Sequence, residues 1–148
     1  MSLKDDISAD MKLALKAREK ARLGSIRLLL AAIQRKEVDE RITLDDAQTL
    51  AVAEKLIKQS RDAESQFRNA GRTELADKEL ADIAVWDKYL PAQLDEAAVD
   101  VMVAAALEET GAASMKDMGK VMGILKPKLQ GQADMGKVSA KIKAALSA

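Results

Sequence analysis

The sequence of 148 residues contains no cysteine and no histidine. The first absence excludes disulfides and thiolate chemistry, and the second removes the commonest metal ligand and general base. Most familiar catalytic sites are therefore excluded, and we expect no metal and no cofactor. Aromatic residues make up only 2% of the chain, and there are two prolines. Because the apolar residues are mostly alanine, leucine, valine and methionine, we predict an all-α fold of packed helices.

Long apolar runs are missing as well. No segment approaches 18 consecutive apolar residues, and the beginning of the chain is charged within four residues and has no apolar run of the length of a secretory signal. We therefore expect a cytoplasmic protein with no membrane partner. Its length allows one domain or two small ones.

Side chains that cap helices mark the first predicted helix starts. Ser2 with Asp5, and Thr43 with Asp46, have the spacing of a capping box, in which two residues three positions apart satisfy each other's backbone N–H groups. We predict a first helix from the beginning of the chain to about Arg18 and a second helix after it. A third helix should start after Thr43.

Glycine and proline indicate where helices end. Gly24 is an alternative end for the first helix, because glycine inside a helix costs about 1 kcal/mol. Residues 38–42 show no helical periodicity and are expected to form a connection. Gly71 should end the third helix. A fourth helix, with Ala76, Leu80, Ile83, Trp86 and Leu90 on its core face, should stop at Pro91. We thus predict a four-helix domain over residues 1–91.

Similar signals predict three more helices after a short linker. Asp95, Ser114 and Asp134 are suitable capping residues for their starts. Pro127 should end the second of these helices, because proline has no N–H to donate. The prediction is a three-helix domain over residues 95–148, joined to the four-helix domain.

The charges are strongly segregated, although the formal net charge is zero. Residues 73–110 carry a net charge of −8, whereas residues 112–148 contain seven lysines and two aspartates, a net charge of +5. A segment this basic predicts a polyanion as partner. Residues 16–36 hold seven basic residues and one acid, for which we prefer the interpretation of a solvated helix face. A secondary basic face on the third predicted helix consists of Lys58, Arg61 and Arg68.

The basic segment contains Asp-Met-Gly-Lys-Val twice, beginning at Asp117 and Asp134. Gly119 and Gly123 lie one helical turn apart, so either another helix crosses closely there, or an RNA backbone approaches exposed amides near the helix starts. The methionines of this segment are expected in the core. The candidate RNA-binding residues are Gly119 and Gly123 with the lysines around them, Lys120, Lys126, Lys128, Lys137 and Lys141.

The three aromatic side chains are expected at or beside the core, which leaves no surface on which unpaired bases could stack. Binding of RNA would then depend on phosphates, 2′-hydroxyls and the shape of the fold of the RNA.

Several motifs taken together resemble the YqeY family and the matching C-terminal domain in the B subunit of the tRNA-dependent amidotransferase. They extend over nearly the whole chain and are Lys55, Lys58, Arg61, Ala70-Gly71-Arg72, Leu75-Ala76, Glu79, Tyr89-Leu90-Pro91, Gln93-Leu94, residues 117–123, Gly131 and Ala133-Asp134. The resemblance implies a four-helix bundle joined to a three-helix bundle, and contact with tRNA.

In that amidotransferase, a carbon–nitrogen ligase that uses glutamine as amido-N donor, the similar domain helps to hold misacylated tRNA while other parts perform the chemistry. This chain has no room for an ATP-dependent kinase site or a glutaminase. The resemblance therefore implies a tRNA-binding or accessory module that is no enzyme on its own, with amidotransferase or aminoacyl-tRNA machinery as further partners. The alternative is a helical adaptor that binds another protein.

Overall fold

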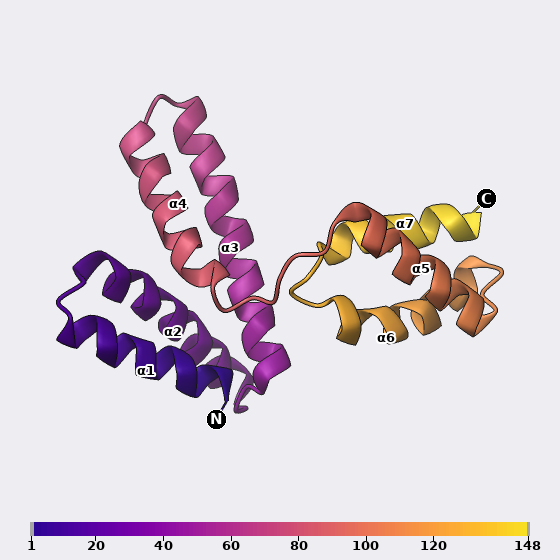
Figure 1. Ribbon diagram of the computed structural model, residues 1–148, viewed down its shortest axis with the longest axis horizontal. Helices are drawn as coiled ribbons and strands as arrows, with labels where there is room; N and C mark the ends of the chain where they lie inside the picture. Colours follow the sequence, from indigo (N-terminus) through magenta and orange to yellow (C-terminus); the bar gives the residue numbers. More distant parts are fainter. Residues whose placement is uncertain (1, 148) are drawn as a thin grey trace. The chain divides into compact units, whose positions relative to one another are not determined.

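The computed structural model describes residues 2–147, which form seven α-helices, one short 3₁₀ helix and no strand (Figure 1). The prediction of an all-α fold is confirmed. The chain divides into two compact units, Met1–Leu90 and Pro91–Ala148. Each unit has its own hydrophobic core.

The first unit begins with a hairpin of α1 (Leu3–Lys16) and α2 (Lys20–Glu40) (Figure 1). The predicted capping box of α1 is confirmed. The N–H of Asp5 donates to the hydroxyl of Ser2 at 3.2 Å, and the N–H of Ser2 donates to the carboxylate of Asp5 at 3.2 Å. Local side-chain chemistry thus fixes where this helix starts.

The connection between α1 and α2 lies at Arg18, and Gly24 is inside α2. The predicted connection over residues 38–42 is wrong in its first part, because α2 continues to Glu40. Contacts from other parts of the unit stabilise this last turn. The carboxylate of Glu37 accepts hydrogen bonds from the ammonium of Lys4 at 2.8 Å and from the N–H of Leu44 at 2.9 Å.

A second hairpin consists of α3 (Asp46–Asn69) and α4 (Thr73–Asp87). The predicted cap at Thr43 is wrong, since Asp45 is the capping residue. The N–H of Gln48 donates to the carboxylate of Asp45 at 2.8 Å, and the N–H of Asp45 donates to the side-chain oxygen of Gln48 at 3.0 Å. The two acids at 45 and 46 made the choice of capping residue ambiguous from sequence.

Gly71 follows α3 with a φ of +75°, in the position predicted for it. Pro91 is not the stop of α4, because the helix already ends at Asp87. Leu80 was expected on the core face but is 44% exposed. Only the side of α4 that carries Ala76, Ile83 and Trp86 is buried, and Leu80 lies off that side.

The buried polar groups of the first unit are paired where α4 meets α2. The hydroxyl of Ser25 donates to the carboxylate of Asp82 at 2.5 Å, and the ammonium of Lys78 lies 3.3 Å from that carboxylate. Such pairing is what burial of polar groups requires. Around these residues lies the core of the unit, which consists of Ile7, Ala14, Leu23, Ile26, Leu29, Ile33, Leu44, Val52, Ala53, Ile57, Ile83 and Trp86.

The second unit contains α5 (Glu96–Thr110), α6 (Met118–Leu129) and α7 (Met135–Ser147). A 3₁₀ turn directly precedes α6. Asp95 caps α5 as predicted, accepting a hydrogen bond from the N–H of Ala98 at 2.7 Å. The core of the unit consists of Val99, Val103, Ala106, Val121, Leu125, Leu129, Val138 and Ile142.

Pro127 does not end α6, contrary to the prediction. The helix continues to Leu129, whose side chain is fully buried in the core. The hydrogen bond that proline cannot make would have gone to the carbonyl of Gly123, an exposed residue, so water can replace it. Met115 also differs from the expectation, because it is 41% exposed rather than part of the core.

Candidate nucleic-acid interface

The core side of α6 determines which of its residues face outward. Val121, Leu125 and Leu129 are buried at intervals of four residues. Gly119 and Gly123 have the same interval but are displaced by two residues, about 200° around the helix, and they are exposed. We call Gly119, Gly123, Lys120, Lys126, Lys128 and Lys137 the α6 surface. Lys126 lies on the same side of α6 as the two glycines, whereas Lys128 lies on nearly the opposite side.

The two glycines are not covered by another helix. Apart from its chain neighbours and the adjacent backbone of α6, a Cβ atom built on either one would have no atom of the described chain within 4 Å. The interpretation of a close helix crossing is therefore wrong. The glycines instead leave a strip of α6 backbone without side chains, which a partner can approach more closely than an ordinary helix face.

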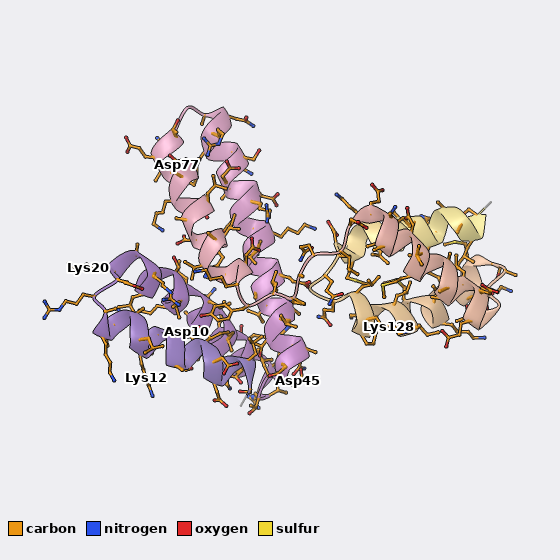
Figure 2. All side chains as sticks on the ribbon, in the orientation of Figure 1. Asp10, Lys12, Lys20, Asp45, Asp77 and Lys128 are labelled. Carbon is orange, nitrogen blue, oxygen red and sulfur yellow. The ribbon has the colours of Figure 1, made fainter. Side chains whose placement is uncertain are left out.

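Four of the five candidate lysines are available at the surface of this unit. Lys120, Lys126 and Lys128 belong to α6, and Lys137 lies in the first turn of α7; all four are exposed (Figure 2 labels Lys128). Within residues 2–147 none of them has an acidic side chain within ion-pair distance. Lys126 and Lys128 also compensate the negative end of the α6 dipole, which is a structural role they can have in addition.

Lys141 differs from the other four. Its ammonium lies 2.6 Å from the carboxylate of Asp100 and 2.9 Å from that of Glu96, both on α5. The hydrogen bond to Asp100 and then that to Glu96 raise the pKa of Lys141. Its charge is already neutralised within the unit, which makes Lys141 the weakest candidate for a phosphate contact.

The secondary basic face on α3 is also largely neutralised. The guanidinium of Arg68 is bound by Glu64 at 2.6 Å and by Asp77 at 3.2 Å, and these two partners raise its pKa. Arg61 lies 3.8 Å from Asp87. Lys58 is exposed and, among the described residues, has no acidic partner within ion-pair distance. Counting the basic residues in the sequence therefore overestimated the positive charge of this face, because the acidic partners come from other positions.

Some amides near the helix starts beside the α6 surface already have partners. The carboxylate of Asp117 accepts hydrogen bonds from the N–H of Ala113 at 3.0 Å and of Ser114 at 3.3 Å, which lower its pKa. At the start of α7 the N–H of Gly136 donates to Asp134 at 2.8 Å. Both aspartates place negative charge there, which favours the lysines over these helix starts as the groups that bind an anion.

A groove lies between α2 and α3, and no pattern in the sequence indicated it. It has a volume of about 350 Å³ and a mixed lining, which comprises Ala32, Arg35, Lys36, Asp39, Glu40, Ala51, Val52, Lys55, Leu56 and Gln59. Its acidic residues lie in the part of the chain that we had expected to be a connection. Only the continuation of α2 to Glu40 brings them opposite α3.

No helix in the described part of the chain combines the length and the apolar character needed to cross a membrane. Likewise, residues 2–147 contain no group of three or more acidic side chains arranged to hold a metal ion.

This chain is similar in sequence to several proteins from fungi. It is 32% identical over 148 residues to altered inheritance of mitochondria protein 41, mitochondrial, from Pyrenophora tritici-repentis, covering 96% of this chain and 80% of the relative. The proteins of the same name from Vanderwaltozyma polyspora and Lachancea thermotolerans are 30% and 32% identical; the matches cover 76% and 70% of this chain. The chain spans 64% and 57% of the length of these last two relatives.

A family model described as Yqey-like protein matches residues 4–146. The motifs that suggested this family lie in both units, from Lys55 on α3 to Asp134 before α7. The chain belongs to the family of YqeY-like proteins.

Proposed function

We propose that this protein is a non-catalytic module that binds tRNA, alone or as an accessory of a glutamine-dependent tRNA amidotransferase. The observation that carries the proposal is the α6 surface. Four exposed lysines without an ion-pair partner among the described residues lie on α6 and at the start of α7. The side of α6 that carries one of them, Lys126, also has a strip of helix backbone without side chains. Phosphates are the usual partners of such lysines, because each contact releases counterions from the nucleic acid.

The aromatic residues support recognition of a folded RNA. Trp86 is 1% exposed, and Phe67 and Tyr89 are partly buried. No aromatic side chain of the described residues is fully exposed, so stacking of unpaired bases would contribute little. The protein is then expected to recognise phosphates, 2′-hydroxyls and RNA shape.

The proposal includes the finer organisation of the chain and its location. We assign residues 1–91 to a four-helix domain and residues 95–148 to the three-helix domain that contacts tRNA. We place the protein in the cytoplasm. The names of the fungal relatives say mitochondrial, which differs from the cytoplasmic location expected for this chain, and a tagged chain imaged in its own cells decides between the two.

The central test is the dependence of tRNA binding on salt. If the four lysines of the α6 surface each contact one phosphate, they should contribute about −3 to −4 to the slope of log affinity against log salt. Replacing both Lys126 and Lys128 with alanine should make the slope shallower by about 2. The matched control, Arg35→Ala with Arg41→Ala, removes two exposed charges that have no ion-pair partner among the described residues from the end of α2 and should leave the slope unchanged. Equal slopes for all three proteins would contradict the proposal.

One observation favours the adaptor as a second candidate. The outward side of α5 carries the exposed apolar residues Ala97, Val101 and Ala104, and Val101 is 69% exposed. Glu108 extends this side with an acid. A helix of this kind can dock against a basic helix of another protein. Val101→Lys should abolish such an association and leave tRNA binding unchanged.

A further inference from the structure

The connection between α1 and α2 is the most basic exposed part of the first unit. Lys16, Arg18 and Lys20 lie within five residues, and Lys12 lies one turn earlier on α1. We call these four residues the hairpin tip. All four are exposed, and Figure 2 shows Lys20 extending outward from the end of the hairpin. The nearest acid in the sequence, Glu19, is bound to Arg22 at 3.3 Å.

Among the described residues, no carboxylate lies within ion-pair distance of the hairpin tip. This separates it from the basic face of α3, where Arg61 and Arg68 have acidic partners. Its positive charge is therefore available to a ligand, although the sequence alone suggested only a solvated helix face.

Arg18 has an unfavourable backbone conformation. Its φ is +58°, in the left-handed region where glycine is preferred after a helix. The N–H of Glu19 donates to the carbonyl of Ala14 at 3.0 Å, and that of Arg18 to the carbonyl of Leu15 at 3.2 Å, which is the usual pattern of a glycine-terminated helix. The fold would accept glycine here. Arg41 has the same kind of backbone conformation, with a φ of +54°. The clustering of Arg18 with Lys12, Lys16 and Lys20 therefore carries the inference, and the backbone conformation alone does not.

We propose that the hairpin tip is a second phosphate-contacting surface, which binds the same structured RNA as the α6 surface. The inference rests on the proposed function and extends it to the first unit. Because the two units are one chain, contact by the first makes contact by the second intramolecular, and the combined affinity exceeds that of either surface.

The arrangement of apolar residues favours RNA over a lipid surface. Leu13 and Leu15 are 59% and 55% exposed near the tip. They are two positions apart, so they lie about 200° from each other around α1. One plane of lipid cannot receive both leucines, whereas membrane binding by a surface helix requires a single apolar face. Phosphates of a folded RNA need only the cations.

Arg18→Gly provides the test, with Arg41→Gly as its matched control. Arg41 also has a left-handed φ, +54°, and it ends α2 far along the helix from the tip. Both replacements remove one charge and one strained residue, so both should raise the melting temperature. Only Arg18→Gly should weaken binding of a transcribed tRNA, with a salt slope shallower by about 0.7 to 0.9. The triple variant Lys16→Ala, Arg18→Gly, Lys20→Ala should make the slope shallower by about 2 to 3.

The outcomes separate this inference from the proposed function. If Lys126→Ala with Lys128→Ala changes the slope while the triple tip variant does not, the hairpin tip is not an RNA contact and the proposed function stands. If neither variant changes it, both proposals fail. Equal effects of Arg18→Gly and Arg41→Gly would show general electrostatic attraction and overturn the inference. Vesicles of phosphatidylserine that bind the wild type but not the triple variant, with unchanged tRNA binding, would assign the tip to lipid instead.

Discussion

The indole N–H of Trp86 on α4 donates a hydrogen bond of 2.7 Å to the main-chain carbonyl of Ser25 on α2. Trp86 is 1% exposed, so no water can replace it as donor. Trp86→Phe keeps an aromatic ring but removes this hydrogen bond and leaves a cavity where the larger indole lay. The carbonyl keeps its partner within α2, so we expect the free energy of unfolding to fall by about 1–3 kcal/mol from the lost hydrogen bond and the cavity together. Urea unfolding followed by circular dichroism measures this, and a loss below about 0.5 kcal/mol would contradict it.

The glycines of α6 should affect stability and binding in opposite directions. Apart from the adjacent backbone of α6, alanine at Gly119 or Gly123 meets no atom within 4 Å, and each replacement should stabilise the helix by about 0.5–1 kcal/mol. If RNA approaches the bare backbone there, the same variants should bind tRNA more weakly. Thermal unfolding of each variant measures its stability, and titration of the same samples with tRNA measures its binding. Raised stability with unchanged binding would show that RNA does not approach this strip.

Lys141 and Lys128 should respond differently to the same replacement. Lys141→Ala removes an ammonium that Asp100 and Glu96 already neutralise, so the salt slope of tRNA binding should stay close to that of the wild type. Lys128→Ala should remove one phosphate contact and so make the slope shallower by about 0.7 to 0.9. A larger effect of Lys141→Ala would mean that its carboxylate partners release it when RNA binds.

Tyr89 predicts how the first unit responds to alkaline pH. Burial raises the pKa of its phenol above the ordinary value of 10.0, and the hydrogen bond of 2.6 Å to Asp10 raises it further. The stability that this neutral phenol contributes is fully present below pH 10, and it is lost as pH rises through the higher folded pKa. Melting temperatures between pH 9 and pH 11 should therefore fall more steeply for the wild type than for Tyr89→Phe. If the melting temperatures of the two proteins fall equally with pH, the ionisation of Tyr89 does not affect the stability of the first unit.

The purified chain should have no amidotransferase chemistry by itself. It lacks cysteine and histidine, and so it has neither the thiol nor the imidazole of common nucleophilic sites. We expect no release of ammonia from glutamine and no amidation of misacylated tRNA above a blank without protein. Turnover without added subunits, which persists through repeated purification, would show that the chain is an enzyme.

Much of the helical architecture follows from local chemistry in the sequence. Ser2 with Asp5, and Asp95 with the N–H three residues later, make their capping bonds within one turn. Gly71 and Gly111 end their helices with positive φ for the same local reason. Such contacts join neighbours in the chain, so the residue types are sufficient to predict them.

The wrong boundaries share a different cause. The last turn of α2 is held by Lys4 and Leu44 through Glu37, and α6 passes Pro127 because Leu129 is buried in the core. In both cases packing with distant residues outweighs the local tendency to end the helix. Periodicity in the sequence contains no information about these distant partners.

For the candidate interface, the sequence by itself determined the all-helical fold and the excess of lysine, and the tertiary structure decided which lysines are free. Lys126 and Lys141 look alike in a basic segment, yet only Lys141 meets Glu96 and Asp100, more than 40 residues earlier in the chain. An ion pair depends on a distance of a few ångströms between side chains of different helices. Helix packing sets that distance, and a count of charges along a segment does not include it.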